Sequence, residues 1–389
     1  MSPLANSNVP VAKANAMEPF YPLCAFVCER CFLVQVEDFN SPQHIFNDQY
    51  AYFSSYSSLW LEHARRYTER MIARLGLDGS TQVIEIASND GYLLQYMAQE
   101  GIPVLGIEPT ANTAQVAIDK GIPTRVEFWG VEAACALAAE LKADLLIGNN
   151  VLGHVPDIND FIAGLKIALE DGGTITIEFP HLLNLIELNQ WDTIYHEHFS
   201  YLSFSTAERM FEAHGLRLFD VEEQPTHGGS LRIFGCHADD PRDRTDAAGA
   251  MRERERAAGL EDAGTYVEHH ARVVEDKRQI LELLIALKRE GNAIAGYGAA
   301  AKGNTLLNYC GVGRDFLDFT CDVNPHKQGH LLPGTHIPIL APGAIAERRP
   351  DVVLILPWNI RDEVMDQLSF IHEWGGRFAA RAPELRLFG

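Results

Sequence analysis

Apolar and polar positions alternate along the chain with two periods, two residues and about 3.6 residues, which predict strands and helices respectively. Apolar runs predict buried strands at 82–87, 104–107, 124–127, 144–148 and 174–179. Helical spacing predicts helices at 59–75, 92–100 and 111–120. Strands that alternate with helices are typical of a doubly wound parallel sheet. Two later runs, 216–221 and 230–234, predict an antiparallel pair at its end.

A second unit of the same kind follows a charged stretch. The stretch 239–256 carries mixed charge, and 260–290 has the pattern of a long, solvated connecting helix. Strands are predicted after it at 292–295, 319–324 and 351–357. The fold class is therefore α/β with two Rossmann-like units. We expect three domains, at residues 1–55, 56–240 and 241–389.

Composition and charge exclude several classes of protein. The chain has 389 residues, of which 47% are hydrophobic and 22% charged, as is ordinary for a globular protein. Its net charge of −21 argues against a partner of duplex nucleic acid, which requires a basic face. No apolar run approaches membrane-spanning length, and the N-terminus lacks the features of a signal peptide. The odd number of cysteines, seven, fits a reducing cytoplasm, and we expect a cytoplasmic monomer or dimer.

The N-terminal residues contain half of a typical structural zinc site. Cys28 and Cys31 form a CxxC pair, but no second CxxC exists in the chain. Cys24 and His44 are candidates for the other two ligands, and free thiols are an equally good interpretation. The run 49–56, with its phenols and hydroxyls, predicts either a polar ligand pocket or a covered domain interface.

The carboxyl ends of the predicted strands carry a candidate nucleoside site. In open α/β sheets ligands bind there, close to helix N-terminal amides. Glu108 ends the second strand, at the position where a carboxylate holds ribose hydroxyls. The turn 88–91 is not GxGxxG, so a nucleoside without pyrophosphate is favoured, and S-adenosylmethionine is the candidate. The residues expected to bind it are Glu85, Ala87, Ser88, Asp90, Gly91, Glu108, Pro109, Asn149 and Asn150.

Candidate chemistry is densest at Tyr195–Tyr201, which contains two imidazoles, a carboxylate and two phenols. A histidine titrates near neutrality, and a neighbouring carboxylate can orient it, so the stretch suits proton transfer. A polar surface loop with a satisfied histidine is the alternative. In the second α/β unit, Lys302 follows a Gly-Ala turn and can meet phosphate, and Asp322 ends a strand and can hold a ribose.

These motifs resemble the three-domain sugar C-methyltransferases, which methylate a carbon of deoxy keto-sugars attached to nucleotides. The matching stretches are 85–94, 106–109, 150–157, 195–203, 227–232 and 296–308. The resemblance implies a class I methyltransferase-type sheet, parallel with an antiparallel end, a second C-terminal Rossmann-like domain and a small N-terminal module. It implies that His198 is the base, with Glu197, Tyr195, His154 and Tyr50 around the sugar.

The resemblance also implies that the C-terminal half helps to bind a nucleotide sugar, which we expect to be dTDP-linked. The residues expected to contact this substrate are Tyr52, Ser54, His196, Gly229, Ser230, Arg232, Tyr297, Lys302, Asn304 and Asp322. Family members carry another CxxC upstream of the Pro3–Ser7 motif, so either the N-terminus is incomplete or the zinc site is degenerate. Any zinc would be structural. The alternative functions are an NAD-linked sugar oxidoreductase and a non-catalytic sugar-nucleotide binding protein.

Overall fold

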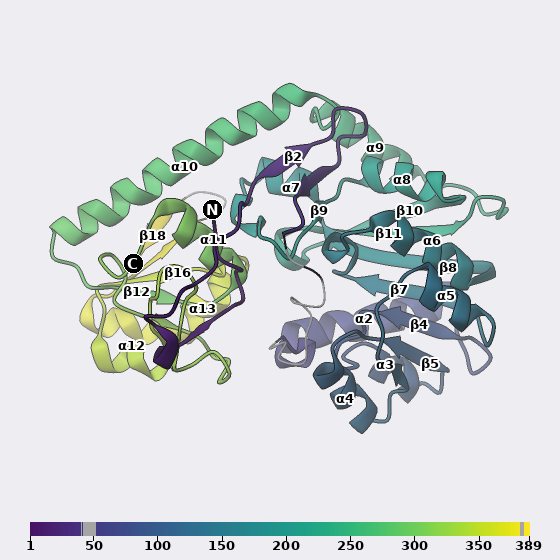
Figure 1. The fold of residues 1–389 in the computed structure, drawn as a ribbon, viewed down its shortest axis with the longest axis horizontal. Coiled ribbons are helices and arrows are strands. Elements are labelled where there is room, and N and C mark those ends of the chain that lie inside the picture. Colours follow the sequence, from purple (N-terminus) through teal and green to yellow (C-terminus); the bar gives the residue numbers. More distant parts are fainter. Residues whose placement is uncertain (40, 42–51, 382–384) are drawn as a thin grey trace.

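A computed structural model describes residues 1–39, 41, 52–381 and 385–389 (Figure 1). Its largest sheet has seven strands. In spatial order these are β10 (Leu216–Gln224), β11 (Ser230–His237), β8 (Leu169–Pro180), β7 (Ala143–Asn149), β4 (Val83–Ile86), β5 (Val104–Ile107) and β6 (Thr124–Arg125). Only β11 runs opposite to its neighbours, which confirms the predicted parallel sheet with an antiparallel end.

Helices cover both faces of this sheet because alternate strand residues point to opposite faces. Leu145 and Ile147 of β7 belong to one core cluster, whereas Leu146 belongs to the other. One face is covered by α2 (Ser58–Leu75), α3 (Leu94–Gln99) and α4 (Ala111–Asp119). The opposite face is covered by α5 (Val131–Ala138), α6 (Ile158–Ala168), α8 (Phe204–Ala213) and α9 (Asp246–Ala257).

A second sheet of six strands forms the C-terminal half. Its strands, in spatial order, are β15 (Ile339–Leu340), β13 (Thr320–Cys321), β12 (Ile294–Tyr297), β16 (Val352–Ile355), β17 (Arg377–Ala380) and β18 (Arg386–Phe388). All run parallel except β18. Helices α11 (Ala301–Cys310), α12 (Gly343–Arg348) and α13 (Arg361–Gln367) complete this half.

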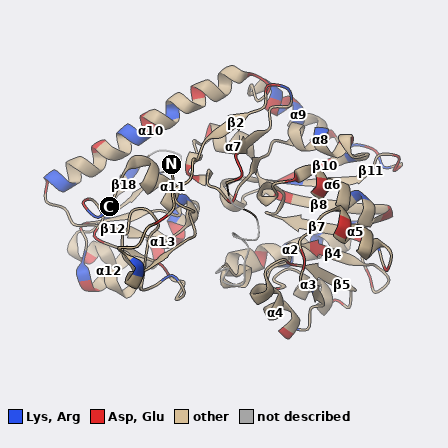
Figure 2. Cartoon of the chain, viewed as in Figure 1, with Lys and Arg blue, Asp and Glu red and all other residues tan. Residues whose placement is uncertain are grey.

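Helix α10 (Ala263–Arg289) crosses from the seven-stranded half to the six-stranded half (Figure 1). Charged residues of both signs are spread along it (Figure 2), and only Asp276, Ile280, Leu284 and Leu287 are buried. The predicted long connecting helix is therefore present. In the part of the chain that the structure describes, no helix is long and apolar enough to span a membrane.

The N-terminal residues contact both halves. Strands β2 (Ala25–Val27) and β3 (Val34–Val36) form a small sheet with β9 (Ser200–Tyr201), which ends the histidine-rich stretch. Strand β1 (Val9–Pro10) pairs instead with β14 (His330–Leu331) in the C-terminal half. The first residues of the chain thus lie across the junction of the two halves, beside the stretch that carries most of the candidate chemistry.

Candidate active site

The imidazole of His198 is held in one orientation. Its Nδ1 lies 3.0 Å from the backbone carbonyl oxygen of Thr193, and because a carbonyl can only accept, Nδ1 carries the hydrogen. In the neutral ring Nε2 then carries a lone pair. The ring lies against that of Tyr195, tilted by 35° with centroids 4.0 Å apart, and meets His154 edge to face at 4.6 Å. Three of the predicted catalytic residues therefore come together.

His154 reaches this cluster from η3 (Leu152–His154), which follows strand β7. Its Nδ1 donates to the backbone carbonyl of Glu197, 2.8 Å away. The two segments approach closely at Gly153, where a Cβ would lie 2.9 Å from the carbonyl oxygen of Ser200. Burial lowers the pKa of His154 to about 4 and the pKa of His198 well below its usual value. Both imidazoles are therefore neutral at neutral pH.

Glu197 does not orient an imidazole with its carboxylate, so that expectation is wrong. Both carboxylate oxygens lie 2.7 Å from Nδ2 of Asn6, and the side chain is buried. Burial raises the pKa of Glu197 to about 7, against the hydrogen bond from Asn6 and the charge of Lys327, which lower it. A carboxyl group with that pKa exists in both protonation states near neutrality. It is the backbone of Thr193 and Glu197 that orients the two histidines.

His196 faces away from the cluster, which contradicts its expected contact with substrate. Its Nε2 donates to the backbone carbonyl of Pro22, 2.9 Å away, and its ring meets the edge of Tyr21. The chain turns here, with the backbone N–H of His198 donating to the carbonyl of Tyr195 at 2.9 Å, so the alternation of an extended strand does not apply. His196 therefore points away from His198 and fastens the loop to the N-terminal residues. Tyr50 lies outside the described residues. The side chain of Tyr52 is exposed, and Ser54 is buried.

The cofactor turn follows β4 and has an unusual backbone. Ala87, Asn89 and Gly91 all have positive φ, at 58°, 51° and 73°, and so does Asn150 after β7, at 54°. Non-glycine residues rarely adopt this conformation, and such positions gather at ligand sites. The predicted turn thus lies at the carboxyl ends of two adjacent strands, where a doubly wound sheet binds its ligand.

Buried oxygens without a hydrogen-bond partner among the described residues surround this turn. They are Oε1 and Oε2 of Glu85, Oγ of Ser88, Oδ1 of Asp90, Oδ1 of Asn149 and Oδ1 of Asn150. Burial raises the pKa of Glu85 well above its usual value, against a lowering effect of the Tyr92 hydroxyl. A buried acceptor without a donor is costly, so the set fits a ligand rich in donors and positive charge. S-adenosylmethionine, with its ammonium, sulfonium and ribose hydroxyls, is such a ligand.

Glu108 braces the same turn. It is buried at the end of β5, and its carboxylate accepts from the backbone N–H of Asn89 at 2.8 Å and of Thr110 at 2.9 Å. A carboxylate has about four acceptor positions, and the hydroxyl of Thr110 donates to this one as well, so one position remains for a ribose hydroxyl. The side chain of Asn89 in turn accepts from the backbone N–H of Ser54 at 2.9 Å, which fastens the start of the α2 segment over the turn. Pro109 follows Glu108 directly.

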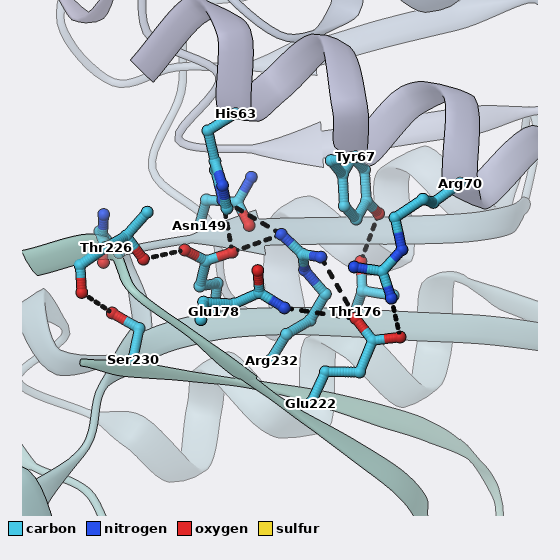
Figure 3. A network of polar contacts seen from close by, with 12 residues as sticks. His63, Tyr67, Arg70, Asn149, Thr176, Glu178, Glu222, Thr226, Ser230 and Arg232 are labelled. Atoms are coloured by element: carbon cyan, nitrogen blue, oxygen red, sulfur yellow. Dashed lines mark hydrogen bonds and ion pairs between the residues drawn. The ribbon is translucent and has the colours of Figure 1, made fainter. Parts of the chain in front are cut away.

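Three predicted substrate contacts, Gly229, Ser230 and Arg232, prove to be structural. Arg232 is almost fully buried, and its Nη2 lies 2.6 Å from Oε2 of Glu178 on the neighbouring strand (Figure 3). His63 of α2 lies 2.9 Å from the same oxygen. Ser230 is buried and donates to the carbonyl of Thr226, while Gly229, at φ +111°, packs so closely on Asn184 that a Cβ would clash. The contacts among Arg232, Glu178 and His63 tie α2 to the sheet.

In the C-terminal half only some predicted contacts remain available to a ligand. Lys302 lies half-buried at the start of α11, with Nζ 2.7 Å from Oδ1 of Asn359 and 4.5 Å from the centre of the Trp358 ring. Burial lowers the pKa of Lys302 to about 8. Asp322 accepts from the backbone N–H of Ala299 in the Gly-Ala turn at 2.7 Å.

The other two predicted contacts in this half serve the structure. Tyr297 is buried in the hydrophobic core of the six-stranded sheet, so its expected substrate contact is wrong. Asn304 is also buried, and its Nδ2 donates to the backbone carbonyl of Ala5 at 2.6 Å. The amide of Asn304 therefore holds the N-terminal residues in place.

A buried charge network that the sequence did not reveal holds the beginning of the histidine-rich stretch. Asp192 accepts from Nη1 of Arg381 and from Nε1 of Trp358, each at 2.8 Å. Nε of Arg381 also donates to Asp276 of α10 at 2.8 Å. Buried charges must be paired, so this network fixes the backbone just before Thr193 against the C-terminal half. Its members are far apart in sequence, and no local motif marks them.

The candidate zinc residues show only part of a site. Hydrogen bonds from the backbone N–H groups of Arg30 and Cys31, and then from the thiol of Cys31, lower the pKa of Cys28, and Cys24 is exposed. Over residues 1–39, 41, 52–381 and 385–389 no group of three histidine, cysteine or acidic residues could hold a metal ion. His44 lies outside these ranges. The described residues therefore do not make up a closed four-ligand zinc site.

Comparison with known families agrees with this architecture. Residues 60–221 match a methyltransferase domain, residues 225–383 a C-methyltransferase C-terminal domain and residues 1–46 a zinc-binding domain whose model is described as putative. The fold and the cofactor turn define a methyltransferase that uses S-adenosylmethionine. The chain belongs to the family of C-methyltransferases that combines these three domains.

Among individual proteins, the chain is 35% identical to the C-methyltransferase NovU of Streptomyces niveus over 371 residues, 95% of this chain and 88% of NovU. A ubiquinone biosynthesis O-methyltransferase of Leptothrix cholodnii is 34% identical over 105 residues, 25% of this chain and 43% of that protein. The chain also matches the solved structure of the magnesium protoporphyrin IX methyltransferase of Synechocystis PCC 6803. That match covers 45% of this chain and 78% of the other, at 15% identity and a TM-score of 0.35. The family assignment supports neither the oxidoreductase nor the non-catalytic alternative.

Proposed function

We propose that the chain methylates a carbon next to the ketone of a nucleotide-linked, and more narrowly a dTDP-linked, deoxy keto-sugar. A carbon next to a ketone becomes nucleophilic only when a base removes its proton and the enolate oxygen is stabilised. The observation that carries the proposal is the orientation of His198. Thr193 holds its Nδ1–H, which leaves the Nε2 lone pair as the proton acceptor.

S-adenosylmethionine supplies a methyl group already activated for transfer. The chain's own residues would hold it: Glu85, Asp90 and Asn149 offer buried acceptors, and Glu108 has one acceptor position left for the ribose. Their site lies at the carboxyl ends of β4 and β7, and His154 follows β7 directly. Holding two reactants in line removes much of the entropic barrier to transfer.

Electrostatics around His198 suit a base that works only on bound substrate. Burial lowers its pKa, so the ring is neutral and ready to accept at neutral pH, but a low pKa also makes it a weak base. An anionic substrate or a developing enolate would place negative charge beside the ring and raise that pKa. Tyr195, whose ring lies beside that of His198, is the group that we assign to the enolate oxygen, because its hydroxyl can donate a hydrogen bond. The neutral ring of His154 donates its N–H to the carbonyl of Glu197 and therefore cannot donate to that oxygen.

The C-terminal half has the groups expected for the nucleotide. Lys302 brings a cation to the start of α11, and Asp322 stands beside the Gly-Ala turn. A pyrophosphate needs positive charge and N-terminal helix amides, while a ribose needs a carboxylate. The same helix, α11, reaches the loop that carries the base, since Oγ1 of Thr305 donates to the carbonyl of Ile194 at 3.0 Å. We therefore infer that the sugar extends from this half towards His198.

Proton exchange tests this proposal without requiring methyl transfer. The chain is incubated in heavy water with a panel of nucleotide-linked keto-sugars, and deuterium uptake is followed by mass spectrometry. We expect the wild type to exchange the acidic proton of one of them and His198→Asn to slow exchange by roughly 10²–10⁴. His196→Asn is the matched control, since that imidazole faces Pro22 and should leave exchange intact.

Each outcome has a defined meaning. No exchange by the wild type with any keto-sugar would reject the substrate class. Normal exchange by a folded His198→Asn variant would reject this residue as the base and direct attention to His154. Glu197→Gln should slow exchange only partly, because the carboxyl is held by Asn6 and does not hold the imidazole. Labelled donor with the exchanging sugar then identifies the methylated carbon.

A further inference from the structure

Residues 2–21, here called the N-terminal strap, form a closed loop that is fastened to the C-terminal half. Ser2 and Tyr21 close it through two backbone hydrogen bonds, of 2.8 and 2.9 Å. Strand β1 pairs with β14, and Glu18 accepts from the backbone N–H of Gly334 at 2.8 Å and pairs with His336 at 2.9 Å. Together with the bond from Asn304 to Ala5, these contacts give the strap a fixed position.

From this position the strap reaches a candidate catalytic residue of the other half. Asn6 is exposed, Glu197 is 5% exposed, and Nδ2 of Asn6 lies 2.7 Å from both carboxylate oxygens. The amide therefore lies on the solvent side of the carboxylate, next to Ala5, whose carbonyl is bound by α11. Residues 1–46 match a zinc-binding domain, and zinc binding does not explain why Asn6 contacts this carboxylate.

We propose that Asn6 is a positioning residue of the active site: it holds the side chain of Glu197 in place and sets the protonation state of its carboxyl group. Because the strap is fastened to the C-terminal half, the position of Glu197 in the other half depends on how the two halves pack together. The role of Asn6 in turnover rests on the proposed function, whereas its hold on Glu197 does not.

The electrostatics define what removal of Asn6 should do. A donor to a carboxylate favours the charged form, so without Asn6 the pKa of Glu197 should rise further above about 7. The lowered pKa values of the neighbouring histidines place their titration below this range. The charged group that acts on the carboxyl is Lys327. The titratable groups on the same loop are His198 and His196, on which the α-amino group of Met1 acts, and His154 contacts the backbone carbonyl of Glu197.

Thermal unfolding at two pH values tests the contact independently of turnover. A raised carboxyl pKa means that the folded state binds the proton more tightly than the unfolded state, so stability falls as the pH rises from about 4.5 through about 7. Asn6→Ala and the equally sized Asn6→Asp should therefore lower Tm at pH 8.5 by several degrees more than at pH 5. Ser7→Ala, an exposed neighbour on the same strap, is the control and should change neither value.

A double variant provides the decisive arm. Asn6→Asp with Glu197→Gln reverses donor and acceptor across the same contact, so it should recover most of the Tm lost by Asn6→Asp at pH 8.5, without recovering turnover. Equal losses at both pH values, or no recovery in the double variant, would overturn the proposal. If a substrate is found, the inflection of kcat with pH should move upwards by about one pH unit in Asn6→Ala. Unchanged inflection with the expected Tm pattern would reject the catalytic role of Asn6 while leaving the contact established.

Discussion

Replacing Arg232 distinguishes a structural residue from a substrate-binding one. Arg232 is 1% exposed and pairs at 2.6 Å with Glu178, whose carboxylate is fully buried (Figure 3). Burial alone would raise the pKa of Glu178, but the hydrogen bond with His63 and the charge of Arg232 outweigh it and lower the pKa to about 2. One pKa unit corresponds to about 1.4 kcal/mol, so the change from 4.5 favours the ionised carboxylate by about 3 kcal/mol.

Arg232→Met keeps much of the side-chain volume but leaves Glu178 buried without its cation. Removing one partner of a buried ion pair costs about 3–5 kcal/mol, so the free energy of unfolding at pH 7 should fall by that amount. Denaturant unfolding measures it. The double variant Arg232→Met with Glu178→Gln removes both charges and should recover much of the loss, because no uncompensated charge remains.

The pH dependence has a defined sign. A lowered carboxylate pKa stabilises the fold above the unfolded pKa of about 4.5, and this stability is lost as the pH falls towards about 2. The deficit of Arg232→Met should therefore shrink over that interval, since the lone carboxyl becomes protonated. A substrate-binding arginine predicts the opposite result: normal unfolding free energy and a raised KM. That result would refute the structural assignment.

Three further predictions concern the ligands. Glu108→Ala should weaken S-adenosylmethionine binding by roughly 1–3 kcal/mol, through lost ribose bonds and a loosened turn, and unchanged affinity by calorimetry would place the ribose elsewhere. Lys302→Ala should raise the KM for the sugar nucleotide and leave donor affinity alone; a change confined to the donor would reverse the assignment of the two halves. Metal analysis should find less than one zinc per chain, because the described residues unite only Cys28 and Cys31, and one tightly bound zinc would implicate Cys24 or His44.

Local patterns were sufficient to predict the strands of the seven-stranded sheet and the turn after β4, but only three of the six strands of the second sheet. Strand periodicity follows from side chains that alternate between two faces, so Val83–Ile86 and Ala143–Asn149 were recognisable as buried strands. Parallel strands present their carboxyl ends at one edge, so Glu85 and Asn149 could be expected to meet there. The composition of Tyr195–Tyr201 likewise marked the candidate for proton transfer before its geometry was known.

The partner of each polar group was decided only by the tertiary structure. Arg232 belongs to a stretch shared with the family, but its burial against Glu178 depends on a residue 54 positions away in the sequence. Glu197 and Asn6 are separated by 191 positions. The chain turns between Tyr195 and His198, so that His196 fastens a segment while His198 faces the cluster. Residue type and spacing show which kinds of hydrogen bond or ion pair a side chain can form. Which donor or charge reaches it depends on long-range packing, and in this protein that packing brings the strap and the C-terminal half against the same short loop.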